Sequence, residues 1–342
     1  MTEPAHLRVV AAGRTDSGRV RDHNEDRVLV APELGLFVVA DGMGGHATGH
    51  VASATAVASM RNFFEATAGE RFAPDAPEDA PLSPSALRLV HAVRKANRDI
   101  FEIASKHAEH RGMGSTVVAL HVEGRSVTIA HVGDSRCYRI RDGAIAQLTR
   151  DHSLLGEALL VKPNLTPAEL AGLPKNVITR ALGIRASVKV DAQQLELEVG
   201  DLLLLCSDGL HGMLDDATIA DAAGLNEDLA EACELLVALA NEAGGTDNVS
   251  VVLVGGFAPK APATLAAGVA REAEAPELVT VEATEELVED ALAQFDGVLP
   301  AQELERLRRG EIVEVSVPRC AACGTPILAG NAFCNECGAR VG

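Results

Sequence analysis

The sequence is short of aromatic residues and of positive charge, and it lacks long hydrophobic runs. Its 342 residues include no Trp and one Tyr, so the aromatic stacking surfaces that bind single-stranded nucleic acid are nearly absent. The 30 basic residues stand against 49 acidic ones, for a formal net charge of -19, which also disfavours nucleic-acid binding. The longest apolar runs, such as residues 202–206, are far shorter than the roughly 18–20 residues that span a bilayer. We therefore expect no nucleic-acid partner and no membrane span.

The cysteine content and the N-terminus predict a cytoplasmic protein. The chain has 7 cysteines, an odd number, and its C-terminal region holds two Cys-x-x-Cys pairs. This pattern favours a reducing compartment and a metal site over a disulfide framework. The first residues also lack the basic stretch and apolar core that are typical of a secretory leader.

Short apolar runs alternate with longer helical patterns up to about residue 257. Five runs predict strands, at residues 36–40, 116–120, 127–131, 202–206 and 249–254. Two segments predict helices, from the Ser83-Pro84 pair to about residue 107 and from 228 to 243. Few and clustered helices favour packed sheets flanked by helices over a strict β-α-β alternation.

The segment from residue 258 to 318 has a different composition. It is rich in Ala, Pro and Glu, and it carries 13 acidic residues against 5 basic ones. We interpret it as an acidic linker, with a short amphipathic helix at about residues 284–292.

Acidic residues stand at the ends of the predicted strands. Asp41 and Asp208 follow apolar runs and precede a Gly, Asp134 follows another run, and Asp247 comes just before the run at 249. A Glu25-Asp26 pair precedes a further short run. Carboxylates gathered at one rim would bind hard cations such as Mg²⁺ or Mn²⁺. A single Asp-Gly after a strand is more often part of a turn than a metal ligand, and spacing alone cannot show that these residues converge, so both interpretations stay open.

Eight motifs in a fixed order narrow this choice. They are Gly18–Asp26, Ala40–His46, Gly114–Thr116, Val132–Arg136, Leu148–Ser153, Asn176–Gly183, Cys206–Gly209 and Thr246–Asn248. This ordered set, over roughly residues 7–257, resembles the metal-dependent PPM family, the protein phosphatase 2C-like serine/threonine phosphatases, in their bacterial form.

The resemblance implies an α+β fold, an αββα sandwich of two antiparallel sheets flanked by helices, for a phosphatase domain at residues 1–257. It implies a site for two Mn²⁺ or Mg²⁺ ions at one end of the sandwich, with a third cation as in bacterial members. The implied metal-binding residues are Asp26, Asp41, Gly42, Asp134, Asp208 and Asp247. Among them Asp41 would bridge two ions, the Gly42 carbonyl would bind one of these, and Asp134 would share the third ion with Asp208.

The resemblance also implies an activity. The chain would hydrolyse phosphoserine and phosphothreonine in proteins by attack of a metal-activated water, opposing a serine/threonine kinase. The implied catalytic residues are Arg21, Glu25, Asp26, Asp41 and Asp208. Arg21 would grip the substrate phosphate, and Glu25 and Asp26 would hold metal-bound waters. The alternative is a catalytically weak, phosphatase-like scaffold or signalling adaptor that acts through the C-terminal region.

Two features of the motifs bear on catalysis and specificity. Many eukaryotic members have a His directly after the Asp-Gly pair, where this chain has Met43, and His46 lies three residues later. The leaving-group acid is therefore unassigned. Residues 160–173 resemble the flap beside the active site, which affects substrate choice.

The C-terminal region carries a separate metal-binding pattern. Cys320, Cys323, Cys334 and Cys337 form two Cys-x-x-Cys pairs separated by ten residues, which is typical of a tetrahedral Zn²⁺ site. The pattern resembles a zinc ribbon at residues 319–342, too small to fold without its metal. Only two basic residues accompany the cysteines, so we favour a protein partner for the ribbon over nucleic acid. A redox dithiol pair is the weaker alternative.

Overall fold

The computed structural model describes residues 8–44, 48–156, 177–225 and 228–257, together with 279–280 and 314–315. The chain divides into two units, Met1–Pro262 and Ala263–Gly342. In the second unit, β13 (Val279–Thr280) pairs antiparallel with β14 (Glu314–Val315). The predicted linker helix and the four ribbon cysteines lie outside the described residues.

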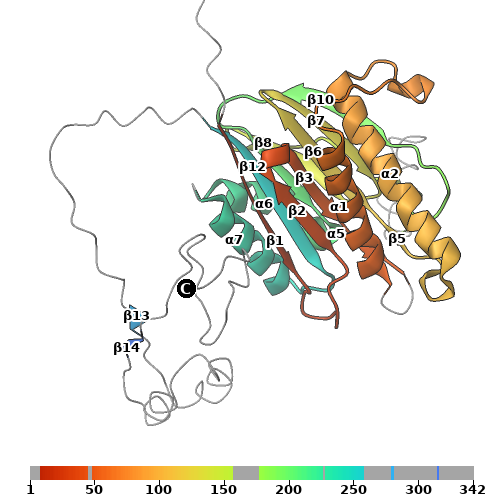
Figure 1. The fold of residues 1–342 in the computed structure, drawn as a ribbon. Coiled ribbons are helices and arrows are strands. Elements are labelled where there is room, and N and C mark those ends of the chain that lie inside the picture. The colour runs from red at the N-terminus through yellow and green to blue at the C-terminus, as the bar shows by residue number, and fades with distance from the viewer. Residues whose placement is uncertain are drawn as a thin grey trace, which may run out of the picture. The chain divides into compact units, whose positions relative to one another are not determined.

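Two antiparallel sheets form the centre of the first unit (Figure 1). The first sheet has the order β1 (Arg8–Asp16), β12 (Val249–Phe257), β11 (Leu202–Cys206), β8 (Arg136–Arg141) and β9 (Ala144–Gln147). The second has the order β10 (Asp191–Glu196), β7 (Ser126–Val132), β6 (Val117–Glu123), β3 (Leu36–Ala40) and β2 (Arg27–Ala31). A short pair, β4 (Gly42–Met43) and β5 (Gly114–Ser115), stands beside them.

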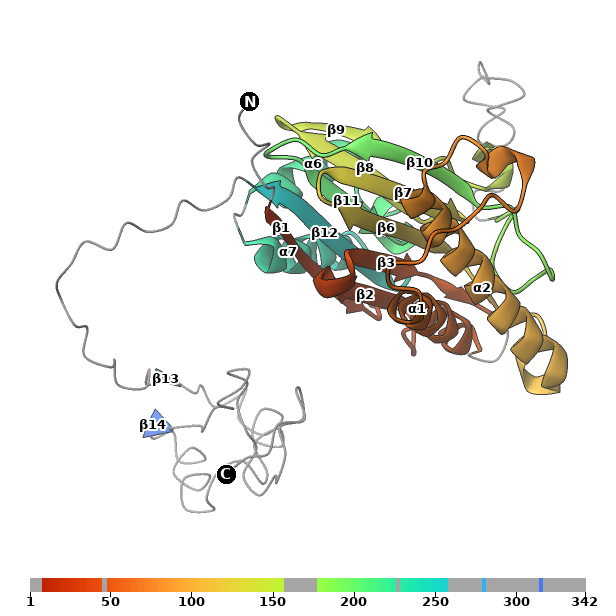
Figure 2. The same cartoon turned by 45° about the horizontal axis from the view of Figure 1, so that its top comes forward.

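Helices cover the outer faces of both sheets (Figure 2). The second sheet packs against α1 (Gly49–Ala66) and α2 (Pro84–Lys106). The first sheet packs against α6 (Asp216–Gly224) and α7 (Leu229–Glu242), next to the short α5 (Asp208–His211). Three 3-10 turns, at Pro32–Leu34, Pro77–Asp79 and Ala108–His110, complete the regular structure of the described residues.

Alternating side chains of the strands build a layered core. In β3, Val38 and Ala40 pack against the helices, whereas Phe37 and Val39 pack against the other sheet. Strands buried on both faces read as continuous apolar runs rather than as a polar–apolar alternation. This is why the central strands are visible in the sequence, and the α+β sandwich of two antiparallel sheets flanked by helices is confirmed.

Most predicted elements match the structure within a few residues. The strands expected at 36–40 and 202–206 are β3 and β11, and the two predicted helices are α2 and α7. The Ser83 hydroxyl accepts a hydrogen bond from the Ala86 N–H and so caps α2. Helix α1 was not predicted, because its many Ala, Ser and Thr residues give no clear apolar stripe.

Two further expectations concern hydrophobicity and cysteines. Within the described residues, no helix combines the length and apolarity needed to cross a membrane. Cys137, Cys206 and Cys233 are buried and free, and burial raises the pKa of the Cys206 thiol to about 12 and that of Cys233 to about 11. Such thiols are unreactive at neutral pH.

Candidate metal and phosphate site

The predicted acidic residues gather at one edge of the two sheets because of strand register. Ala40 at the end of β3 faces Arg27 at the start of β2, so the Glu25-Asp26 pair lies next to Asp41. In the other sheet, Cys206 at the end of β11 pairs with Val251 near the start of β12. This pairing brings Asp208 and Asp247 together.

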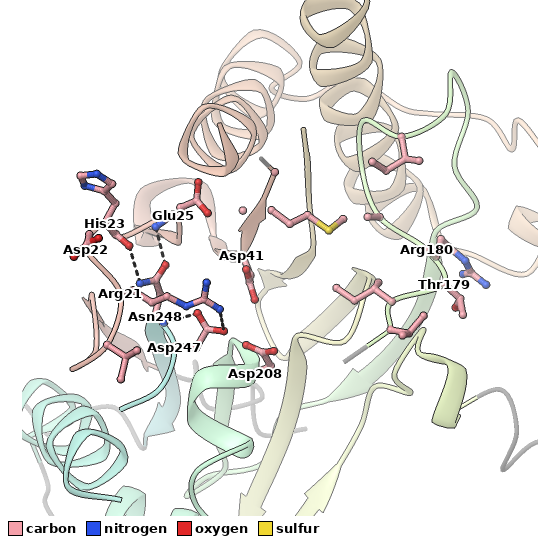
Figure 3. Close-up of a pocket in the computed structure, with 18 residues that line it drawn as sticks. Arg21, Asp22, His23, Glu25, Asp41, Thr179, Arg180, Asp208, Asp247 and Asn248 are labelled. Carbon is pink, nitrogen blue, oxygen red and sulfur yellow. Dashed lines mark hydrogen bonds and ion pairs between the residues drawn. The ribbon is translucent and has the colours of Figure 1, made fainter. Parts of the chain in front are cut away.

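A cleft of about 940 Å³ opens at this edge. The predicted residues that line it are Arg21, Glu25, Asp41, Gly42, Asp208 and Asp247. Figure 3 shows the three aspartates facing a common space, with Thr179 and Arg180 on the other side of the cleft. Two predicted residues, Asp26 and Asp134, do not line the cleft. They nevertheless influence it, because the charges of both raise the pKa of Asp41.

The backbone of Asp41 is fixed by Thr116, which lies between β5 and β6. Thr116 N–H donates to the Asp41 carbonyl (2.8 Å), and the Asp41 N–H donates to the Thr116 hydroxyl (3.2 Å). The Thr116 hydroxyl in turn bonds to the Ser135 hydroxyl (2.7 Å), beside Asp134. At Gly42, a Cβ atom would lie 2.2 Å from the Gly49 carbonyl oxygen. Only Gly fits there, as the motif requires.

Asp26 is a buried carboxylate next to the site. Its side chain is 1% exposed, and its Oδ2 accepts a hydrogen bond from the Ser207 hydroxyl at 2.8 Å. The Ser250 hydroxyl also bonds to Asp26. Burial raises the pKa of Asp26 to about 7, although both serine hydrogen bonds act in the opposite direction.

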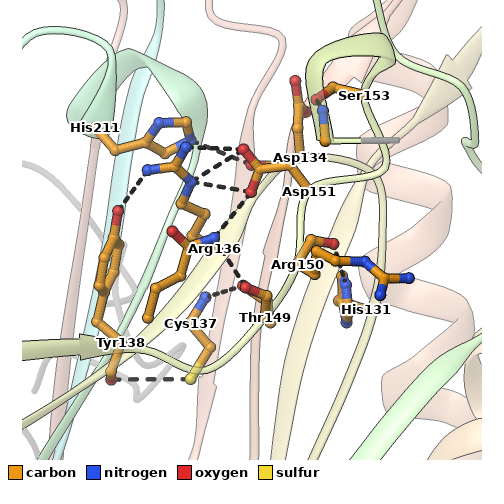
Figure 4. Close-up of polar contacts among 12 residues, drawn as sticks. His131, Asp134, Arg136, Cys137, Tyr138, Thr149, Arg150, Asp151, Ser153 and His211 are labelled. Atoms are coloured by element: carbon orange, nitrogen blue, oxygen red, sulfur yellow. Dashed lines mark hydrogen bonds and ion pairs between the residues drawn. The ribbon is translucent and has the colours of Figure 1, made fainter. Parts of the chain in front are cut away.

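A network of charged and polar groups lies beside Asp134 (Figure 4). Arg136 donates three hydrogen bonds to the Asp151 carboxylate, at 2.8 to 3.2 Å, and another to the Tyr138 hydroxyl. His211 bonds to the Asp134 backbone carbonyl at 3.1 Å. The Oδ1 atom of Asp134 is buried and accepts no hydrogen bond from the described residues. A buried acceptor without a donor is costly unless a cation binds it.

Burial and crowding together raise the pKa of three aspartates of the cluster, Asp41, Asp134 and Asp208. Burial raises the pKa of Asp134 to about 7, and the charge of Asp208 adds to this effect. Burial and four neighbouring aspartates raise the pKa of Asp41 well above its usual range. Burial and the charge of Asp247 also raise the pKa of Asp208. Divalent cations would relieve this repulsion.

The residues present therefore fit hard divalent cations. The donor set consists of carboxylate oxygens and a backbone carbonyl, which suit Mg²⁺ and Mn²⁺. The observation that most directly supports a cation here is the buried Asp134 Oδ1 atom, which accepts no hydrogen bond from the part of the chain that the structure describes.

A loop at residues 17–25 carries the two other predicted groups. Arg21 is exposed and donates a hydrogen bond to Asp247 over 2.8 Å. Glu25 accepts a hydrogen bond from the Gly49 N–H at the start of α1 (2.8 Å). The buried Asn248 side chain donates to the carbonyls of Ser17 and His23 and accepts from the Glu25 N–H, at 2.8 to 3.0 Å.

Four residues that position the site had no separate role in the sequence analysis. Thr116, Ser207, Ser250 and Asn248 hold Asp41, Asp26 and the 17–25 loop. Three of them lie inside the eight motifs, and Ser250 lies two residues after the last one. Small polar residues close in sequence to a predicted metal-binding Asp could therefore have been predicted to position it.

A second group of potential ligands lies behind the cleft wall. Ligand atoms of His131, His152 and Asp191 lie within 4.8 Å of one another. The Gly133 N–H donates to His152 Nδ1 (3.0 Å), and His152 Nε2 lies 3.2 Å from Asp191 Oδ2. Arg180 donates to the other Asp191 oxygen at 2.7 Å. The Asp191 charge already has a cationic partner, so we interpret this group as an ion-pair network and not as a metal site.

Two catalytic expectations fall partly outside the described residues. Met43 lines the cleft at the position where a His was considered. His46 and the predicted flap at 160–173 lie outside the part of the chain that the structure describes.

The chain is similar to known proteins over most of the first unit. Residues 18–244 match the family model for protein phosphatase 2C. The serine/threonine phosphatase stp of Listeria innocua is 36% identical over 247 residues, which cover 70% of this chain and 93% of that protein.

Solved structures show the same similarity. The catalytic domain of the serine/threonine protein phosphatase PstP, in complex with two manganese ions, is 34% identical, with a TM-score of 0.62. The match covers 73% of this chain and 99% of that catalytic-domain chain. The phosphatase Stp1 of Staphylococcus aureus is 31% identical, with a TM-score of 0.63, and the match covers 75% of this chain and 98% of Stp1.

Proposed function

Because the chain belongs to the protein phosphatase 2C family, we propose that it is a metal-dependent protein serine/threonine phosphatase. The reaction is the hydrolysis of phosphoserine and phosphothreonine in proteins. The observation that carries the proposal is the convergence of Asp26, Asp41, Asp134, Asp208 and Asp247 beside a cleft that also holds Arg21.

Each acidic residue has a proposed part in holding the cations. Asp41, Asp208 and Asp247 line the cleft and would hold two Mn²⁺ or Mg²⁺ ions, together with the Gly42 carbonyl. Asp134, whose Oδ1 accepts no hydrogen bond from the described residues, would hold a third ion together with Asp208. Glu25 and Asp26 would orient water at the first two. When bound, the cations supply a water of lowered pKa and neutralise phosphoryl charge.

Arg21 binds the substrate phosphate. Its guanidinium is about half exposed and lies at the cleft, where paired N–H donors match two phosphate oxygens. The hydrogen bond to Asp247 fixes the direction in which the guanidinium points. The loop below it is fastened by Asn248, so the group is ordered before substrate arrives.

Hydrolysis of a phosphothreonine peptide tests this function. The proposal predicts turnover that requires Mn²⁺ or Mg²⁺ and stops when EDTA is added. Addition of excess Mn²⁺ after EDTA should restore it. No turnover with any divalent cation would overturn the proposal and favour the phosphatase-like scaffold.

For the remainder of the chain we propose an acidic linker at residues 258–318 and a zinc ribbon at 319–342. Four thiolates at the spacing of Cys320, Cys323, Cys334 and Cys337 support a tetrahedral Zn²⁺ site. We propose that the ribbon binds a protein partner and brings phosphoprotein substrates near the cleft. The full chain should hold one Zn²⁺ that a Cys320→Ser/Cys323→Ser double variant loses. Equal zinc content in both proteins would contradict the ribbon.

The setting of the activity is also a proposal. A serine/threonine phosphatase opposes a serine/threonine kinase, and reduced cysteines favour the cytoplasm. The three buried, unpaired cysteines of the first unit support a reducing compartment.

A further inference from the structure

Exposed aliphatic side chains stand at the mouth of the cleft. Val20 is 65% exposed, Val177 45% and Ile184 49%, and all three line the same cleft as the acidic residues. In the described residues, the other large hydrophobic side chains that are exposed are Leu154, Val199 and Leu225. Half of this exposed apolar set is therefore placed around the phosphate site.

Val20 is presented by a fastened loop. The Arg19 N–H donates to the Gly245 carbonyl (2.7 Å) on one side of it. On the other side, Arg21 bonds to Asp247. Asn248 donates to the carbonyls of Ser17 and His23 and so fixes both ends of the loop. The backbone thus holds Val20 in an exposed position.

Ile184 is held in place by a buried amide. Asn97 of α2 is 1% exposed and accepts a hydrogen bond from the Gly183 N–H at 2.9 Å. Its Nδ2 donates to the carbonyls of Arg185 and Ala186, at 3.1 and 3.3 Å. The hydrogen bonds of the buried Asn97 side chain therefore fix the backbone on both sides of Ile184.

The backbone around Val177 is held by hydrogen bonds to residues 152–154. The Leu154 N–H donates to the Val177 carbonyl (2.9 Å), and the Thr179 N–H donates to the His152 carbonyl (2.8 Å). The charge next to it is already neutralised, because Arg180 pairs with Asp191 at 2.7 Å. This wall of the cleft thus presents aliphatic surface and a paired charge to a ligand.

We propose that Val20, Val177 and Ile184 form an apolar rim that selects phosphopeptides with aliphatic side chains next to the phosphorylated residue. The inference rests on the proposed phosphatase function and names its substrate class. With the phosphate at Arg21 and the acidic cluster, an extended peptide advances about 3.3 Å per residue. The two residues on either side then reach the cleft walls, where their burial excludes water from the rim.

Two phosphothreonine peptides test the rim. They have identical ends and differ at the two positions on each side of the phosphothreonine, which are Leu in one peptide and Ser in the other. The measured quantity is the ratio of kcat/KM for the Leu peptide to that for the Ser peptide, with saturating Mn²⁺. Because the ratio is taken within one enzyme, a general change of turnover cancels. We expect a ratio of about ten for the unaltered protein.

Val20→Ser and Ile184→Ser should each lower this ratio about threefold, mainly through a higher KM for the Leu peptide. The matched control is Val199→Ser, which removes a valine that is 58% exposed away from the cleft and should keep the ratio of ten. A ratio near one in the unaltered protein, or a ratio that neither rim variant lowers, would overturn the inference.

The small substrate p-nitrophenyl phosphate separates this failure from failure of the proposed function. It has no flanking residues and cannot contact the rim as a peptide does. Hydrolysis of this ester and of both peptides at equal rates would overturn the rim alone. No Mn²⁺-dependent hydrolysis of the ester or of either peptide would overturn the phosphatase function and the rim with it.

Discussion

The guanidinium of Arg21 donates a hydrogen bond to the carboxylate of Asp247 over 2.8 Å, although the two residues are 226 positions apart in the chain. The charge of Asp247 raises the pKa of Arg21 further. The proposed phosphate-binding group is therefore joined directly to a proposed metal-binding residue. The hydrogen bond between Arg21 and Asp247 thus connects the proposed phosphate-binding group to the proposed metal site.

Arg21→Lys should lower kcat/KM for p-nitrophenyl phosphate about 10- to 100-fold, mainly through a higher KM. Lysine keeps the charge but loses the planar pair of donors. Steady-state kinetics, with inhibition by inorganic phosphate as a second readout, measure the effect. The control is Arg19→Lys, an exposed arginine of the same loop whose backbone N–H makes the structural contact. Equal phosphate inhibition in both variants would contradict the role of Arg21.

The strands of the two sheets could be predicted from the sequence only in part. Residues 36–40 and 202–206 are apolar on both faces, so their runs predicted β3 and β11. Strands with one polar face, such as β10 and β1, lack this signal. Their pairing depends on contacts between distant segments.

The acidic residues could be named from the motifs, but their environment could not. That Asp26 accepts a hydrogen bond from Ser207 depends on the end of β11 in one sheet lying close to the start of β2 in the other. The spacing of residues along the chain does not contain this convergence. Likewise, the apolar rim joins Val20 to residues more than 150 positions later.

Asn248→Ala should lower the free energy of unfolding by about 2–4 kcal/mol, because it removes three hydrogen bonds of a buried amide. It should also lower kcat, since the loop that carries Arg21 loses its fastening. Urea denaturation measures the first effect. As a control, Gln147→Ala removes an exposed amide that makes two hydrogen bonds and should cost less than about 1 kcal/mol. Equal losses in the two variants would contradict the proposed role.

Ser207→Ala should weaken Mn²⁺ binding about tenfold, since Asp26 loses a hydrogen bond that favours its ionised form. Isothermal titration calorimetry of the metal-free protein measures the affinity. Ser187→Ala, at an exposed position, is the control and should leave it unchanged. Unaltered Mn²⁺ affinity in Ser207→Ala would show that Asp26 does not depend on this contact.

Stabilisation by Mn²⁺ should increase with pH between about 5.5 and 7.5. Burial raises the pKa of Asp26 and of Asp134 to about 7 in the metal-free protein, from about 4 in the unfolded chain. The metal-free native state therefore binds more protons than the unfolded state in this window, and these groups stabilise it less as pH rises. Metal binding must displace the same protons, so its affinity increases with pH.

The difference in melting temperature with and without Mn²⁺, at pH 5.5, 6.5 and 7.5, measures this linkage. Burial lowers the pKa of His121 and of His131 to about 4. Their contribution to the stability of the native state therefore decreases as pH falls from about 6.5 to 4. It does so with and without metal, and it therefore cancels in the difference. A Mn²⁺-dependent shift that is the same at all three pH values would contradict the linkage.

The most direct test of the central claim compares Asp208→Asn with Asp216→Asn in phosphothreonine-peptide hydrolysis under a Mn²⁺ titration. Asp208 lines the cleft, whereas Asp216 is an exposed residue in the first turn of α6. The account predicts that Asp208→Asn lowers kcat by about 100-fold or more, with circular dichroism unchanged, and that Asp216→Asn retains full activity. Unchanged Mn²⁺-dependent turnover in Asp208→Asn would contradict the claim that this acidic cluster is the catalytic metal site.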